Sequence, residues 1–230
     1  MLFEAHSIVG GYRAIRIVRD VSLEIDSGET VAVLGRNGVG KTTFLRILMG
    51  LADRIGGEIR LAGRLVAPRD PRALARAGVT FVPDDRGVFP RLTVGENIRL
   101  ARDAAYASAE FDAFALFPDL KRRLDQPAGT LSGGQQQQLA LARALATGPR
   151  LLIVDELSQG LQPSIVQSLA EALRTVTRAK GLALILVDQN PDLAMRICDW
   201  VMVMERGQVV AAGSSATLAN DPTFLDLLVV

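Results

Sequence analysis

The fold is decided by the stretch Gly35-Arg36-Asn37-Gly38-Val39-Gly40-Lys41-Thr42. An aliphatic run, Thr30–Leu34, precedes this stretch, and an apolar-periodic segment, Lys41–Met49, follows it. This order predicts a buried strand, a glycine-rich loop and a helix. Glycines let the backbone turn around an anion and point N–H groups at it, at a helix N-terminus whose dipole favours negative charge. We therefore predict a phosphate-binding loop rather than a glycine-rich turn that binds nothing. In it, Lys41 reaches the β- and γ-phosphates of ATP, and Thr42 ligates Mg²⁺.

A second aliphatic run, Leu151–Val154, ends in two adjacent acids, Asp155 and Glu156. Strand side chains alternate between faces, so the two acids leave the sheet edge in different directions. Asp155 suits the Mg²⁺ shell, and Glu156 suits the task of polarising an attacking water. By itself this ending is weak evidence, because many strands end in an acid that caps a neighbouring helix. Together with the upstream phosphate loop, it predicts ATP hydrolysis.

The rest of the chain alternates short apolar runs with helical patterns, which is typical of βαβ units and a largely parallel sheet. The expected strands of that sheet are Thr30–Leu34, Val79–Val82, Leu151–Val154 and Leu182–Val187. The expected helices are Lys41–Met49, Gly133–Ala146, Pro163–Ala179 and Pro191–Cys198. The remaining expected strands are Leu2–Val9 and Ile17–Ile25, which look antiparallel, and Trp200–Met204 and Gln208–Ala212, which flank a hairpin-like Arg206-Gly207 turn. Between Val94 and Gln126 the pattern is helical, and we interpret it as a helical subdomain inserted into the sheet domain.

Composition excludes several classes of protein. Hydrophobic residues make up 49% of the 230 residues, which suits a packed core. The formal charge is +1, so no global basic field is available for nucleic acid. The single cysteine, Cys198, rules out an intrachain disulfide and is interpreted as a packing residue. No apolar run reaches the roughly 18 residues of a membrane span, so any work at a membrane would require another chain.

The most specific motif is Leu131-Ser132-Gly133-Gly134-Gln135, which opens a predicted helix. A serine hydroxyl and exposed glycine N–H groups at a helix N-terminus form a second possible anion site. Here the sequence resembles the ABC ATPases, whose signature motif has this form. The resemblance implies that two cassettes stack head to tail, so that the signature of one closes on the ATP of the other.

The resemblance extends over essentially all 230 residues and implies a single ABC ATP-binding domain. The implied fold is α/β: a P-loop NTPase cassette with a mixed or parallel sheet core, an N-terminal antiparallel β subdomain and an inserted helical subdomain. Residues 1–90 and 150–230 would form a RecA-like core with its antiparallel part, and residues from about 91 to 149 would form the helical subdomain with the signature motif.

The resemblance also assigns site residues. Those implied to bind ATP are Tyr12, Gly35, Arg36, Asn37, Gly38, Val39, Gly40, Lys41, Thr42, Thr43, Ser132, Gly133, Gly134 and Gln135. The implied catalytic residues are Lys41, Glu156 and Gln189, and the implied metal-site residues are Thr42, Asp155 and Asp84. Tyr12 would stack on adenine, although it could also be a plain surface tyrosine. Gln189 stands where most relatives have a switch histidine; its amide can donate to the γ-phosphate, although a slow, degenerate site is the competing interpretation.

One branch of the family is matched in more detail. The segment Val82–Val94, the pair Gly160-Leu161 and the pair Gln189-Asn190 look like the ATP-binding subunits of branched-chain amino-acid importers. The chain departs from that branch at Asp84 and Asp188, where glutamate is more usual, and at Leu157, where proline is usual. Gln162 stands where the family as a whole usually has an aspartate.

This resemblance implies partners and a place in the cell. The partners would be a second, non-identical ABC cassette, membrane permease subunits and, indirectly, an external solute-binding protein; a homodimer is possible in isolation. The chain would be cytoplasmic, held on the inner face of the cell membrane by the permease. The alternatives are a cassette for urea or short amides, an exporter cassette, and a soluble ABC ATPase acting on ribosomes or DNA. The single cassette, the near-neutral charge and the lack of a heptad insertion disfavour the last of these.

Overall fold

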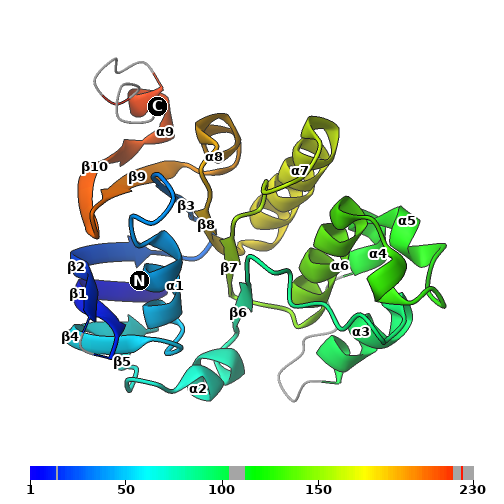
Figure 1. The fold of residues 1–230 in the computed structure, drawn as a ribbon, viewed down its shortest axis with the longest axis horizontal. Helices are drawn as coiled ribbons and strands as arrows, with labels where there is room; N and C mark the ends of the chain where they lie inside the picture. Colours follow the sequence, from blue (N-terminus) through cyan, green and yellow to red (C-terminus); the bar gives the residue numbers. More distant parts are fainter. Residues whose placement is uncertain (14, 104–111, 220–223, 225–230) are drawn as a thin grey trace.

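The computed structural model describes residues 1–13, 15–103, 112–219 and 224, whose strands form two sheets (Figure 1). Within these residues, six strands are ordered β10-β9-β3-β8-β7-β6 in one sheet, and four are ordered β2-β1-β4-β5 in the other. The larger sheet contains β3 (Thr30–Leu34), β6 (Val79–Val82), β7 (Leu151–Asp155), β8 (Ala183–Val187), β9 (Trp200–Glu205) and β10 (Gln208–Ser214). The smaller sheet contains β1 (Phe3–Tyr12), β2 (Ile15–Ile25), β4 (Asp53–Leu61) and β5 (Arg64–Leu65).

The larger sheet is mixed. Strands β6, β7, β8, β3 and β9 run parallel, and β10 returns antiparallel to β9. The predicted parallel sheet and the predicted hairpin at Arg206-Gly207 are therefore confirmed. The antiparallel pairing of β1 with β2 is also confirmed, although β1 continues to Tyr12 and β2 already begins at Ile15.

Strands β4 and β5 were not predicted from the sequence. In β4, Gly56-Gly57 interrupts the alternation of polar and apolar residues, and only Ile59 and Leu61 are buried. The strand forms because β1 pairs along its length, which is a long-range interaction that a local pattern does not report.

The helices connect these strands. Their bounds are α1 Lys41–Leu48, α2 Pro71–Arg76, α3 Val94–Arg102, α4 Ala113–Leu116, α5 Pro118–Lys121, α6 Gly133–Ala146, α7 Pro163–Lys180, α8 Pro191–Ile197 and α9 Ser215–Leu218, with a 3₁₀ turn, η1, at Ala128–Thr130. The predicted helices at α1, α6, α7 and α8 are confirmed to within a residue or so at their ends. Helix α7 has proline at its first position and ends at Gly181 in a left-handed conformation, which are common start and stop signals.

The core lies on both faces of the larger sheet. Every residue of β3, β7 and β8 is buried. Alternate residues face opposite ways: Leu152 and Val154 join a cluster with α6, α7 and α8, whereas Leu151 and Ile153 join a cluster with α1 and the smaller sheet. This two-sided burial explains why these strands appear in the sequence as continuous aliphatic runs. Cys198 is buried, as expected for a packing residue.

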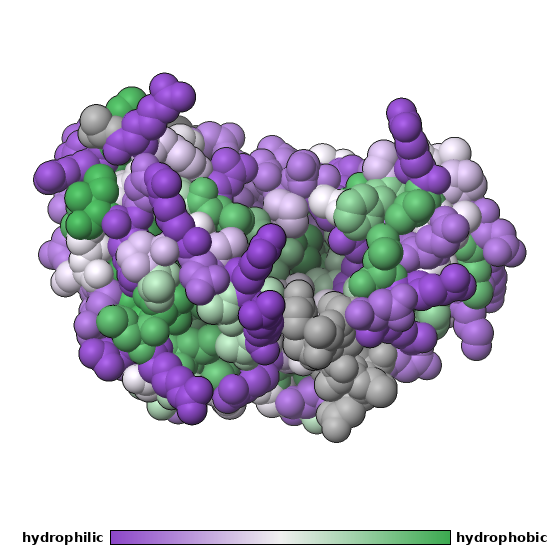
Figure 2. All heavy atoms as spheres, turned by 90° about the horizontal axis from the view of Figure 1, so that it is seen from below, coloured by the Kyte–Doolittle hydropathy of each residue, from purple (hydrophilic) through white to green (hydrophobic). Residues whose placement is uncertain are grey.

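Helices α3, α4 and α5 pack against α6 and form a lobe beside the sheets (Figure 1). Residues 104–111, which belong to the predicted helical segment, lie outside the described residues. Seen from below, the two lobes are mostly hydrophilic, with hydrophobic areas on each and a hollow between them (Figure 2). Among the described residues, none of the helices has both the length and the apolar character needed to cross a membrane.

Candidate active site

The phosphate loop joins the end of β3 to the start of α1 and is held by its backbone. Gly40 precedes the helix in a left-handed conformation with φ 110°. Gly35 has φ 145°, and a Cβ there would lie 2.4 Å from the carbonyl oxygen of Met204, so only glycine fits. The carbonyl of Val39 accepts a hydrogen bond from Gly207 N–H, 2.8 Å long, which fastens the loop to the β9–β10 turn.

Lys41 lies in the base of the loop and is only 4% exposed. Its ammonium donates hydrogen bonds to the carbonyl oxygens of Gly35 and Arg36, 2.7 and 2.9 Å long. The ammonium is also 3.8 Å from a carboxylate oxygen of Glu156. Burial lowers the pKa of Lys41, and the neighbouring carboxylates, Glu156 first among them, oppose this effect. The Lys41 ammonium thus lies between the phosphate loop and the carboxylate of Glu156, which follows β7.

Asp155 is completely buried, and neither of its carboxylate oxygens has a hydrogen-bond partner in the described part of the chain. Burial raises its pKa to about 6; the nearby Thr42 hydroxyl only partly offsets this, and the charges of Asp84 and Glu156 add to it. A buried carboxylate without a partner is costly, and a hard cation with oxygen ligands is the group that would satisfy it. The Asp155 carboxylate and the Thr42 hydroxyl therefore fit Mg²⁺.

Glu156 is turned out of the strand by its backbone. Its φ of 54° lies in the left-handed region, which is uncommon for a residue with a side chain. The conformation is held by its N–H, which donates to the carbonyl of Val187 on β8 over 2.8 Å. The side-chain amide of Gln189, which follows β8, donates to both carboxylate oxygens of Glu156, at 2.9 and 3.1 Å. Two of the three predicted catalytic side chains, Glu156 and Gln189, are therefore in direct contact.

A cavity of about 370 Å³ covers the loop. It is lined by Ile17, Asn37, Gly38, Gly40, Lys41, Thr42, Thr43 and Glu156. A larger cavity of about 710 Å³ lies between the two sheets, and none of the predicted site residues lines it. Chemistry, rather than size, thus points to the smaller cavity, which combines loop N–H groups, the lysine and the carboxylate.

Tyr12 and Asp84 lie outside this cavity, and one arginine connects them. Arg46 donates to the Tyr12 hydroxyl over 3.2 Å and lies 3.9 Å from an Asp84 carboxylate oxygen. Sequence reasoning missed Arg46. The available signal was its position on α1 four residues after Thr42, which places both side chains on one helix face.

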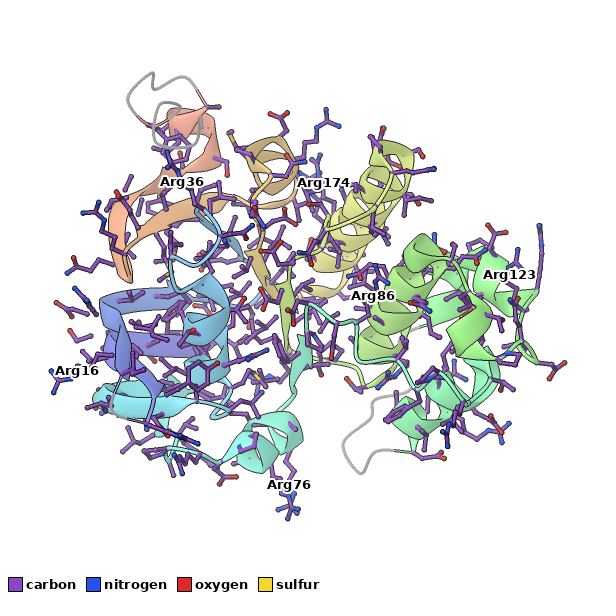
Figure 3. The ribbon with its side chains drawn as sticks, in the orientation of Figure 1. Arg16, Arg36, Arg76, Arg86, Arg123 and Arg174 are labelled. Atoms are coloured by element: carbon purple, nitrogen blue, oxygen red, sulfur yellow. The ribbon has the colours of Figure 1, made fainter. Side chains whose placement is uncertain are left out.

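The signature residues are apart from the phosphate loop within this chain. Ser132 is the N-cap of α6: its hydroxyl oxygen accepts from Gln135 N–H, and the Gln135 side chain accepts from Ser132 N–H. Gly134 is buried and Gly133 is partly exposed, whereas Ser132 is exposed. Arg86, from the loop after β6, covers Gly133 and donates to Gln136 over 3.1 Å; Figure 3 shows it beside α6. Sequence reasoning also missed Arg86.

Two further polar residues, Ser158 and Asp188, link the loop after β7 to the loop after β8. Sequence reasoning noted Asp188 only as a departure from the usual glutamate. Nothing in the local pattern indicates its partner, because Ser158 is thirty residues away in the chain. Gln162, the other departure in this region, is the N-cap of α7 and makes no side-chain cap hydrogen bond.

Residues 18–159 match the sequence model of the family described as ABC transporter. The chain belongs to this family. The ABC cassette is 38% identical to the high-affinity branched-chain amino acid transport ATP-binding protein BraG of Pseudomonas aeruginosa, over 94% of both chains. It is 32% identical to the probable branched-chain amino acid transport ATP-binding protein LivF of Archaeoglobus fulgidus, over 93% of this chain and 92% of the relative.

Other relatives of the cassette have different cargo. The lipopolysaccharide export protein LptB of Acidithiobacillus ferridurans is 30% identical over 96% of this chain and 93% of its own. Among solved structures, the dimeric cassette MJ0796 bound to ADP and Pi superposes with a TM-score of 0.83 at 23% identity, covering 93% of this chain and 99% of the other. This likeness confirms the predicted ABC cassette fold.

Proposed function

We propose that this ABC ATPase powers the import of branched-chain amino acids. The observation that carries the proposal is the 38% identity with BraG over 94% of both chains. The segment Val82–Val94 and the pair Gln189-Asn190 support it, because they follow the sequence pattern of that branch. LptB, at 30%, is matched less well.

In the proposed site, ATP lies with its phosphates on the loop of residues 35–42 and its adenine on Tyr12. Lys41 holds the β- and γ-phosphates, and Glu156 orients the attacking water while Gln189 fixes the carboxylate. Thr42 and Asp155 would hold Mg²⁺, with Asp84 near them; when bound, the metal neutralises charge on the phosphates. The contacts of Lys41 and the unpartnered carboxylate of Asp155 support these roles.

The proposed assembly is a pair of cassettes. Ser132, Gly133, Gly134 and Gln135 would close on the ATP of the facing cassette, which we propose to be a non-identical chain in the cell. Their separation from the phosphate-loop cavity of this chain supports this arrangement. The cassette would be attached to the inner face of the membrane by permease subunits, and an external binding protein would deliver the solute.

The proposal is tested with the cassette reconstituted in lipid vesicles with candidate permease subunits and a second cassette from the same organism. Binding protein loaded with leucine should stimulate ATP hydrolysis and leucine uptake, whereas binding protein loaded with urea should not. Stimulation by urea or a short amide alone would replace the proposed cargo. Absence of any ATP hydrolysis by the complex would refute the proposed function altogether.

A further inference from the structure

Asp188 is the point at which two loops of the active site are joined. It is 1% exposed and lies directly after β8. One carboxylate oxygen accepts from the Ser158 hydroxyl at 2.7 Å, from Gln189 N–H at 2.8 Å and from Asn190 N–H at 2.9 Å. The other accepts from Ser158 N–H at 2.9 Å. The carboxylate thus receives four hydrogen bonds from two loops that are far apart in the chain.

These two loops carry the catalytic pair. Ser158 comes two residues after Glu156, and Gln189 comes directly after Asp188. The two loops are therefore joined at two places. Asp188 is hydrogen-bonded to Ser158, and the next residue, Gln189, donates from its amide to both carboxylate oxygens of Glu156. A shift of either loop would therefore change the distance between Gln189 and Glu156.

A purely structural explanation of Asp188 as a helix cap does not account for these contacts. The N-cap of α8 is Asn190, whose own side chain accepts from Leu193 N–H over 3.1 Å. Both contacts to Ser158 are to the loop after β7 and not to the backbone of α8. A buried carboxylate with charge-assisted hydrogen bonds to both loops fixes their geometry more strongly than a neutral group would.

We propose that Asp188 is a positioning residue for ATP hydrolysis. Its carboxylate locks the loop after β7 to the loop after β8 and thereby keeps the Gln189 amide on Glu156. The inference rests on the proposed function only in taking Glu156 and Gln189 as the pair that acts on the attacking water. The new element is that Asp188 holds Glu156 and Gln189 together although it does not itself line the nucleotide cavity.

The first test is a mutant cycle on the ATPase rate of the purified cassette. In Asp188→Asn the new amide would face Ser158 N–H, so two donors oppose each other while the bonds from Gln189 and Asn190 remain possible. We expect kcat to fall about 10-fold, with the KM for ATP changed less than about 2-fold. In a Gln189→Ala background the same substitution should cause no further loss, because there is no amide left to position. Asp192→Asn, an exposed acid on α8, is the matched control and should behave like wild type.

The inference is overturned if Asp188→Asn keeps wild-type kcat, if the losses from Asp188→Asn and Gln189→Ala multiply, or if the change lies in KM. If the isolated cassette does not hydrolyse ATP, that result counts against the proposed function and not against the role of Asp188. Hydrogen exchange then tests the role of Asp188 without turnover. Asp188→Asn should speed amide exchange both in the segment of residues 156–162 and in that of residues 187–190. Faster exchange in only one segment, or in neither, would mean that Asp188 does not join the loops.

Discussion

The buried carboxylate of Asp155 should destabilise the nucleotide-free protein, and Asp155→Asn should remove that cost. The pKa of Asp155 is raised from 3.8 to about 6, mainly by burial. Since one pKa unit corresponds to about 1.4 kcal/mol, the ionised form costs about 3 kcal/mol of folding free energy at pH 7. Asparagine has the same shape and no charge, so the variant should be more stable than wild type by about this amount.

The sign of the pH dependence makes this prediction specific. Because the pKa is higher in the folded protein than in the unfolded chain, the folded state binds more protons between the two values. Wild type should therefore lose stability relative to the variant as the pH rises from about 4 to about 6, and the difference should stay constant above that. At pH 4 the advantage of the variant should fall below about 1 kcal/mol.

The assay is urea unfolding, without nucleotide and with a chelator present, at pH 4, 5, 6 and 7. At pH 7 the variant should also melt about 6–12 °C higher than wild type, given the usual relation for a chain of this size. A variant that is no more stable than wild type at pH 7 would refute the view that Asp155 is an unpartnered charge. A gain of equal size at every pH would trace the effect to packing instead.

Three other substitutions test separate parts of the site. Glu156→Gln should preserve ATP binding, measured by displacement of a fluorescent nucleotide, and lower hydrolysis at least about 100-fold; unchanged turnover would remove Glu156 from the mechanism. Gly35→Ala should destabilise the protein by more than about 2 kcal/mol in urea unfolding, because its Cβ would lie 2.4 Å from the Met204 carbonyl oxygen. Gly38→Ala, with φ +77° and open space around it, is the control and should cost only about 1–2 kcal/mol; equal losses would contradict the close-approach argument. Gln189→His should add a step near pH 6.5 to the profile of ATPase rate against pH, because histidine titrates there and glutamine does not. If the profiles of variant and wild type superimpose, the side chain at position 189 is not near the reacting groups.

The sequence predicts most of the architecture that surrounds the phosphate loop. The strand before Gly35, the helix from Lys41 and the strand ending at Asp155 are all found, because each has a strong local pattern. The structure also brings Lys41 to Glu156, and Glu156 to Gln189, which follows from the shared carboxyl edge of parallel strands.

What the sequence does not predict depends on contacts between distant segments. Strand β4 contains Gly56-Gly57 and is stabilised by pairing with β1, which its own pattern does not indicate. The left-handed backbone at Glu156 is set by its bond to Val187. The links from Arg46 to Tyr12 and from Asp188 to Ser158 join side chains that are thirty or more residues apart in the chain, and only the tertiary structure brings them together.

In the proposed site, the hydroxyl oxygen of Ser132 would both cap helix α6 and bind an anion. The cap uses a lone pair of the hydroxyl, as acceptor for Gln135 N–H, and leaves the O–H bond able to donate to an anion. The helix cap and the proposed anion contact therefore use different parts of the same hydroxyl. A substitution that removes the hydroxyl would remove both at once. Serine can serve both, whereas an aspartate would cap the helix equally well and repel the anion. An N-cap residue with a donor proton, such as serine, could therefore both begin helix α6 and bind the proposed phosphate, whereas a carboxylate could only begin the helix.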